Sequence, residues 1–404
     1  MPAFNWKSVI WISMLLALPV GATSPAESPT AKTDSAPVAG AGPNVSMVAK
    51  NPRIKSLRVV QTLGARGRFA PTGDHFVFDR KNADGYFDVY LSDLEGNITR
   101  SLTEGNPGIG QRHNGNAVFH PSGNYIVFIS EVDDHYGGKA PCEPGIGLFN
   151  NLWATDTAGK SFWPLTDAPI KKSLADRTPA IATVNPIFSP DGHFLIWTER
   201  YAQGGHHGWG RWRIKGADFV VVDGSPRLQN ERVLFSPRGG NYVTAMGFFD
   251  NTNLLVAGNL DGQHEYAMDE YRLNVRSGSF SNLTHTSDAW EEGASIAPNG
   301  KVVFMSSRDS AEKIALDNPQ WWRQKIYKEW YLMDQDGANV ERLSYFNEPG
   351  APEHSGRSIW AVNMNISRDG RYMLGTVGVG AKGGHPSGPQ SLSVVLVEFA
   401  SPLK

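Results

Sequence analysis

The chain has 404 residues, with 38 Lys and Arg against 40 Asp and Glu and a formal net charge of −2. A nucleic-acid partner would require a basic face, so this balance argues against one. Cys142 is the sole cysteine, which excludes an internal disulfide. We expect Cys142 to be a small loop residue, with a reactive thiol or a metal ligand as the alternatives.

The first residues have the pattern of a secretory signal peptide. Lys7 is followed by an apolar run over 9–20 and by the small residues Val20-Gly21-Ala22. The run is too short to span a bilayer and no second one follows it. We therefore predict a signal peptide at 1–22, a disordered Ala-, Pro- and Ser-rich linker at 23–50, and an exported protein, periplasmic or secreted, without a membrane span.

From residue 51 onward, one strand–turn–strand phrase recurs. Proline fixes φ early in each turn and glycine supplies the positive φ that follows, so a β-hairpin is expected at every copy. Strand repeats of roughly 40–60 residues indicate a β-propeller. The turns are Pro71-Thr72-Gly73, Pro121-Ser122-Gly123, Pro190-Asp191-Gly192, Pro298-Asn299-Gly300 and, without proline, Arg368-Asp369-Gly370.

A second strand pair follows these hairpins and often ends in Leu-Thr or Leu-Ser, as at Leu102-Thr103 and Leu343-Ser344. The third and fourth units are degenerate, and the sixth has no fourth strand after 391–399. Residues 56–61, ahead of the first unit, would supply that strand and close the ring. We predict an all-β, six-bladed propeller of four-stranded antiparallel blades over 51–404, closed by an N-terminal strand.

The phrases resemble the repeat of the TolB-like propeller family, in which Ser-Pro-Asp-Gly is followed by Asp-x-x-Gly and Leu-Thr. The resemblance covers 52–404 and implies the fold, whereas such repeats occur in binding scaffolds and in enzymes alike. TolB itself has an α/β domain ahead of its propeller, and only about 50 low-complexity residues stand here, so we expect a different protein. A Gly-x-Ser-x-Gly elbow does not occur, which argues against a peptidase.

The expected topology divides the disc into two faces. The short-turn face holds the tight turns within the hairpins, and the long-loop face holds the insertions, where binding sites commonly lie. Eight of the eleven histidines map to the long-loop face. The insertions are predicted at 104–114, 131–148, 167–183, 200–216, 258–265, 305–328, 345–361 and 377–390.

Residues that begin the innermost strands are expected to surround the mouth of the central channel, because innermost strands converge on the axis. Histidine suits acid–base chemistry and metal ligation, and tryptophan suits stacking on sugar rings. The alternative for the tryptophans is that they pack the long loops onto the disc. The candidate catalytic residues are His113, His354, Glu292 and Arg68; the candidate ligand-binding residues are Asn116, Asn185, Trp290, Trp360, Asn363, Trp209 and Trp212; the candidate metal ligands are His113, His207 and His354.

Three functions remain open from the sequence. The favoured one is an exported, monomeric propeller that binds a glycan, a peptide or a protein partner on the long-loop face. The second is a carbohydrate-active lyase or hydrolase on an acidic polysaccharide, because propeller lyases that resemble this repeat class use channel histidines, an arginine and in some cases a divalent metal. The third is a structural domain of an envelope assembly. For a cofactor the choice stays between none and a divalent metal (Ca²⁺, Mn²⁺ or Zn²⁺).

Overall fold

The protein is described by a computed structural model over residues 46–404, apart from 206–208, 265, 312, 314–326 and 383–390. The predicted signal peptide and residues 23–45 of the predicted linker lie outside the described residues. Ser46–Met47 forms a short strand, β1, so regular structure begins a few residues before the predicted boundary. Within the described part, no helix is long and apolar enough to cross a membrane.

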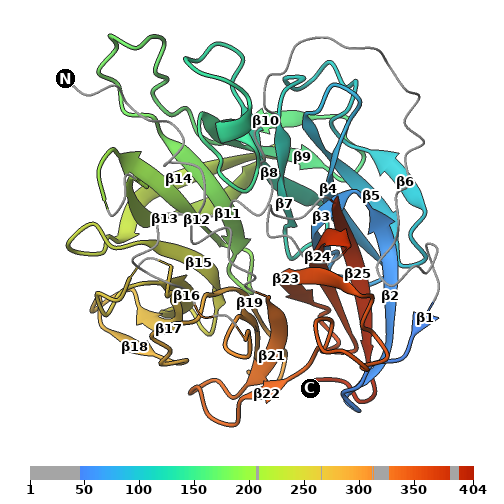
Figure 1. Ribbon diagram of the computed structural model, residues 1–404. Helices are drawn as coiled ribbons and strands as arrows, with labels where there is room; N and C mark the ends of the chain where they lie inside the picture. Colours follow the sequence, from blue (N-terminus) through green and yellow to red (C-terminus); the bar gives the residue numbers. More distant parts are fainter. Residues whose placement is uncertain (1–45, 206–208, 265, 312, 314–326, 383–390) are drawn as a thin grey trace, which may run out of the picture.

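Six antiparallel sheets are arranged around a central axis, as the sequence predicted (Figure 1). In each blade the strands run in order from the axis outward. Blade 1 comprises β3 (Gly64–Phe69), β4 (His75–Lys81), β5 (Phe87–Asp93) and β6 (Ile98–Ser101). Blade 2 comprises β7 (Asn114–Phe119), β8 (Tyr125–Glu131), β9 (Asn150–Asp156) and β10 (Phe162–Pro164). Blade 3 comprises β11 (Ala182–Phe188), β12 (Phe194–Ala202), β13 (Arg211–Val222) and β14 (Ser225–Phe235). Blade 4 comprises β15 (Val243–Phe248), β16 (Asn253–Gly258), β17 (Asp269–Asn274) and β18 (Phe280–Asn282). Blade 5 comprises β19 (Glu291–Ile296), β20 (Val302–Ser306), β21 (Glu329–Met333) and β22 (Glu341–Arg342).

Blade 6 is assembled from both ends of the chain, which confirms the predicted closure. It contains β23 (Arg357–Ile366), β24 (Tyr372–Lys382) and β25 (Ser391–Phe399), and its fourth strand is β2 (Ile54–Thr62). Strand β2 pairs antiparallel with β25, with Leu57 opposite Val397. The ring is thereby closed without an unpaired strand edge between its first and last blades.

The repeated turns have the backbone that the sequence predicted. The glycine of each turn has φ between 69° and 84°, a region that L side chains rarely adopt. In the third copy, the Ser189 hydroxyl donates to Asp191 and accepts the N–H of Phe194, which fixes the turn. The five glycines are Gly73, Gly123, Gly192, Gly300 and Gly370.

Three predicted insertions are shorter than expected. Strand β23 begins at Arg357, inside the predicted loop 345–361. Strand β13 begins at Arg211, so the second part of the predicted loop 200–216 is sheet and Trp212 lies in a strand. Strand β24 extends to Lys382 inside the predicted loop 377–390. The end of β24 offers no alternating polar pattern, which is the usual strand signal. Strand β13 does begin with one, Arg211-Trp212-Arg213-Ile214-Lys215, and the sequence could have revealed it.

Every innermost strand contains a register break, a β-bulge, in its channel-facing part, and β23 has a second break between Arg357 and Ile359. A bulge shifts the alternation of side chains by one position and so redirects polar residues toward the axis. Five of the six bulges contain a residue with positive φ, namely Arg66, Asn116, Asn185, Gly293 and Asn363. The sixth lies between Ala245 and Gly247.

The core lies between successive blades rather than at the axis. Blades 1 and 2, for example, share a buried cluster in which Val77 and Val89 meet Phe119 and Phe128. Burial of large apolar side chains at about 25 cal/mol per Å² supplies most of the driving force for such packing. The rigid ring therefore holds the inner strands, and the residues at their ends, in fixed positions.

Candidate functional site

Partly exposed side chains on the innermost strands mark the channel, because packing between blades buries their alternating neighbours. Three of these side chains were predicted to bind ligand and two to act in catalysis. They are Asn185, Trp360, Asn363, Glu292 and Arg68.

Polar residues of blades 1 to 4 and of blade 6 form a connected group. We call it the blade 1–3 network, because its central residues Asp79, Asn116 and Asn185 belong to blades 1, 2 and 3. Asp79 accepts the backbone N–H of Asn116 at 2.9 Å and the guanidinium of Arg66. Asn116 Nδ2 donates to Asn185 Oδ1 (3.1 Å), and Asn185 Nδ2 donates to Thr244 Oγ1 (2.9 Å). The network consists of Arg66, Asp79, Asn116, Asn185, Thr198, Thr244 and Thr376.

One arrangement recurs in this network. A polar side chain on the second strand of a blade accepts a backbone N–H at the bulge of the next blade. Asp79 does so for Asn116, while Thr198 Oγ1 accepts from Ala245 N at 2.9 Å. Thr376 Oγ1 accepts from the N–H of Arg66 at 2.9 Å. These side chains join neighbouring blades at the axis and have a structural role.

A second polar group lies where blade 5 meets its neighbours; we call it the blade 5 cluster, defined as Glu270, Trp290, Glu291, Glu292 and Lys328. Trp290 is its centre. The indole Nε1 donates to Glu292 Oε2 at 3.2 Å. Lys328 Nζ lies 3.6 Å from the centre of the indole ring, a cation–π contact. One ring thus holds a carboxylate and an ammonium next to the channel.

The ionisation of Glu292 and Lys328 is shifted toward neutrality. Burial raises the pKa of Glu292 to about 7, against the opposing effect of the Lys328 charge. Burial also lowers the pKa of Lys328 to about 7, against the opposing effect of Glu292. Each group can therefore give or take a proton near neutral pH.

The other two carboxyl groups of the cluster are only partly satisfied. Glu270 is fully buried, and neither of its oxygens has a hydrogen-bond partner in the described structure. Glu291 accepts from Ser306 Oγ (2.5 Å) and Arg308 (2.8 Å), yet its Oε2 is also without a partner there. Burial, and then the negative charges of Glu291 and Glu292, raise the pKa of Glu270 well above its ordinary value.

No described contact joins the predicted histidines His113 and His354 to this cluster. His113 is 1% exposed, and its Nδ1 accepts the N–H of Phe87 at 3.0 Å. Burial lowers the pKa of His113 to about 4, so the ring is neutral at physiological pH. His354 Nδ1 donates to the carbonyl of Phe346 at 2.8 Å. No described contact joins His113 to His354, and His207 lies outside the described residues.

The tryptophans differ in accessibility. Trp209 and Trp212 are 3% and 5% exposed and pack on Tyr242, which fits the alternative that they hold loops on the disc. Trp290 is 5% exposed, with Lys328 over its ring. Trp360 is the predicted stacking residue that keeps an accessible surface.

Arg68 is held on the backbone of blade 6. Its Nη1 donates to the carbonyl of Met364 at 2.7 Å, and burial lowers its pKa to about 10. The guanidinium remains charged at physiological pH, so it contributes positive potential to the channel.

Three residues of the insertion after β8 have the chemistry of metal ligands. Glu131 Oε1 lies 2.8 Å from His135 Nε2, and Cys142 Sγ lies 3.6 Å from the same nitrogen. All the potential ligand atoms lie within 4.8 Å of one another. The hydrogen bond from His135, then His113 and Arg112, keep the pKa of Glu131 below its usual value despite its burial.

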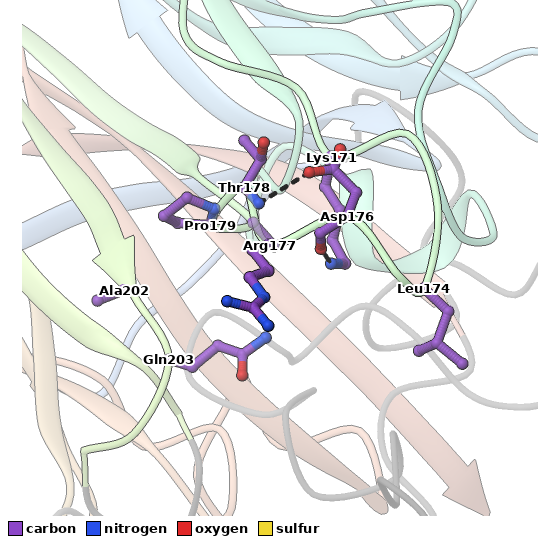
Figure 2. Close-up of a pocket in the computed structure, with 9 residues that line it drawn as sticks. Lys171, Leu174, Asp176, Arg177, Thr178, Pro179, Ala202 and Gln203 are labelled. Atoms are coloured by element: carbon purple, nitrogen blue, oxygen red, sulfur yellow. Dashed lines mark hydrogen bonds between the residues drawn. The ribbon is translucent and has the colours of Figure 1, made fainter.

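A pocket of about 490 Å³ also lies on the long-loop face, between the β10–β11 loop and the end of β12. Figure 2 shows Arg177 extending toward Gln203, while Thr178 N donates to Asp176 at 2.9 Å. Lys171 Nζ donates to the carbonyl of Asp176 and so braces the loop. The pocket combines Arg177 with apolar surface from Leu174, Pro179 and Ala202.

Sequence reasoning identified Trp290 and Glu292 but not the groups that give them their chemistry. Lys328 directly precedes the apolar strand β21, and an ammonium at that position is a signal that could have been used. The sequence gives no characteristic spacing that relates Glu270 to the rest of the blade 5 cluster, or Glu131 and His135 to Cys142. Only folding of the chain brings the residues of each group together.

No protein-family model matches the chain, and no curated protein matches it. Among solved structures, it is similar to a putative TolB from Agrobacterium tumefaciens, with 17% identity, a TM-score of 0.48, and coverage of 85% of this chain and 94% of that one. It is also similar to an oligogalacturonate lyase from Vibrio parahaemolyticus, with 11% identity, a TM-score of 0.48, and coverage of 88% and 96%. An oligogalacturonate lyase in complex with manganese is similar as well, with 12% identity, a TM-score of 0.47, and coverage of 88% of this chain and 96% of that one. The six-bladed propeller that the TolB-like resemblance implied is confirmed by the sheet topology of this chain.

Proposed function

We propose that this protein is an exported β-propeller that binds a ligand on its long-loop face, around the mouth of the central channel. The observation that carries the proposal is the Trp290 contact with both Glu292 and Lys328. A carboxylate and an ammonium on one rigid ring offer a hydrogen-bond acceptor and a positive charge at a fixed separation. Such convergent polar groups on a preformed scaffold are typical of ligand sites.

The chemistry favours a glycan with acidic groups over a neutral one. Arg68 supplies positive charge, Lys328 does so when it is protonated, and Glu292, Asn185 and Asn363 can bind hydroxyl groups. Trp360 offers the accessible ring for stacking. A peptide or protein partner with an acidic side chain would meet the same groups.

A second candidate function is a lyase or hydrolase on an acidic polysaccharide. It is favoured by the pKa of about 7 for both Glu292 and Lys328, because groups that titrate near the working pH make efficient acids and bases. In this version Glu292 takes the role that the sequence gave to His113 and His354. The imidazole of His113 is buried and neutral, and the backbone N–H of this residue donates to Glu131 Oε2 at 3.2 Å.

Binding is tested by calorimetry with uronic-acid oligosaccharides, their neutral counterparts and a set of acidic peptides. We expect Glu292→Gln and Lys328→Met to weaken binding of the best probe by about 10-fold or more, because each removes a charged partner. Glu95→Gln, on the exposed short-turn face, is the control and should bind like the wild type. Equal binding by all three variants, or no binding of any probe by the wild type, would contradict the proposal.

Catalysis is tested on the same oligosaccharides by product analysis. A lyase creates an ultraviolet-absorbing double bond and a hydrolase creates a new reducing end. We expect Glu292→Gln to lower kcat by a larger factor than the factor by which it changes KM. Binding without product formation over the full pH range leaves the non-catalytic version as the correct one.

A further inference from the structure

We propose that Glu131, His135 and Cys142 form a zinc site that fastens the long β8–β9 insertion to blade 2. Glu131 is the last residue of β8, and Cys142 ends the short 3₁₀ helix η3 (Ala140–Cys142). His135 lies between them on the chain. A metal bound by these three would join the start of the insertion to its middle.

The ligand types select the metal. A thiolate, an imidazole and a carboxylate together suit Zn²⁺, whereas Ca²⁺ and Mg²⁺ prefer oxygen ligands alone. Zinc bonds of about 2.0–2.3 Å at tetrahedral angles place a nitrogen and a sulfur ligand about 3.6 Å apart. The observed distance from His135 Nε2 to Cys142 Sγ is 3.6 Å.

The carboxylate needs a small adjustment. Glu131 Oε1 is 2.8 Å from His135 Nε2, a hydrogen-bond distance, and a zinc-bound pair would be about 0.5 Å further apart. On binding, the Cys142 thiol gives its proton to solvent and forms the sulfur–zinc bond. His135 binds through the lone pair of Nε2 with its proton on Nδ1, so the hydrogen bond to Glu131 is exchanged for two metal bonds. A water molecule or the second Glu131 oxygen completes four-fold coordination.

The surroundings hold the ligands in place. The His135 ring stacks on Phe149, with centroids 4.6 Å apart and an interplanar angle of 15°. The side chains of Glu131 and His135 are 0% and 1% exposed, and Cys142 is fully buried. A site so enclosed excludes a substrate, and its effect is on the loop.

The fastened loop reaches the channel. Asn116 Nδ2 donates to the carbonyl of Pro144 at 3.2 Å, and a Cβ at Gly115 would lie 2.5 Å from the Pro144 ring. Lys81 Nζ forms a 2.8 Å ion pair with Glu143. Zinc would therefore fix the loop segment that supports Asn116 and, through it, Asn185.

The test uses Co²⁺ as a spectroscopic substitute for zinc in the purified full chain. We expect about one Co²⁺ per chain, with a thiolate-to-metal absorption in the near ultraviolet. Cys142→Ser should abolish the absorption, and His135→Gln should weaken binding by at least about 10-fold. His193→Gln, an exposed histidine on the short-turn face, is the control and should leave both unchanged.

A wild-type chain without the absorption, or a Cys142→Ser chain that retains it, would overturn the proposal. Should Cys142→Ser fail to fold, hydrogen exchange of wild-type residues 132–149 decides. Zinc should slow exchange there and a chelator should restore it, whereas equal exchange in both conditions would also overturn the site. Neither readout depends on a glycan or peptide ligand, so the ligand proposal and the zinc proposal fail separately.

Discussion

The blade 1–3 network and the blade 5 cluster are both groups of polar side chains buried near the same channel, but they differ in how well their atoms are paired. In the network, Asp79, Asn116, Asn185 and the threonines are bonded to one another or to bulge backbone, and Arg66 Nη2 is the exception. In the cluster, Glu270 has no hydrogen-bond partner in the described structure and Glu291 has one unpaired oxygen.

The difference separates structural from functional polarity. Buried polar groups that are fully paired stabilise a unique arrangement, and their loss is costly. Buried groups that lack partners cost stability in the free protein, and a fold retains them when a ligand, a proton or a reaction uses them. The propeller thus joins blades in one sector of its axis, and in another sector it holds unpaired carboxyl groups beside the proposed ligand site.

The largest effect is expected from Asp79→Ala. The change leaves the Arg66 charge and the Asn116 N–H buried without an acceptor, so the free energy of unfolding should fall by about 3–5 kcal/mol. Urea unfolding measures the loss, with the exposed Asp84→Ala as the control, expected within about 0.5 kcal/mol of the wild type. A loss no larger than that of the control would show that the network does not join the blades.

A smaller loss is expected from Thr198→Val, which keeps the shape of the side chain but removes the acceptor of the Ala245 N–H. An unpaired buried donor costs about 1–3 kcal/mol in unfolding free energy. Thr198→Ser retains the hydroxyl and should recover most of this loss. If valine and serine are equally stable, the hydrogen bond across blades 3 and 4 contributes nothing.

Glu270→Gln, unlike the two substitutions above, should gain unfolding free energy relative to the wild type as the pH rises. The pKa of Glu270 is raised above its ordinary value of 4.5, so the folded state holds its proton more tightly than the unfolded state. Its contribution to wild-type stability is therefore complete below pH 4.5 and is lost as the pH rises through the folded-state pKa. The variant lacks this loss, so its unfolding free energy relative to wild type should increase with pH. Parallel pH curves for the two proteins would show that Glu270 is solvated or paired.

The repeated turns predicted the blades and the closing strand, because proline and glycine act locally and the spacing of hairpins fixes the topology. The same logic located Trp290, Glu292, Asn185 and Asn363 near the axis, since each begins or interrupts an innermost strand. This positional argument did not predict the bulges. A single extra residue in a strand of six to ten residues produces no distinctive pattern in the sequence.

The prediction was least informative for the histidines. His113 precedes β7, as the positional argument required, but its ring accepts the N–H of Phe87 and its backbone N–H donates to the Glu131 carboxylate. Position along a strand does not determine which of two flanking blades covers a side chain. His135 and Cys142 belong to an irregular insertion, where no periodicity relates sequence to direction.

The closing strand has a consequence for the order of folding. Leu57 and Val397 are partners, yet they are separated by almost the whole described chain. Ring closure must therefore wait until β25 has been synthesised, and until then β2 has no sheet to join. If an N-terminal leader directs export, β2, which closes the ring, is the last strand to be paired. The central channel of such a chain is complete only after β25 has followed.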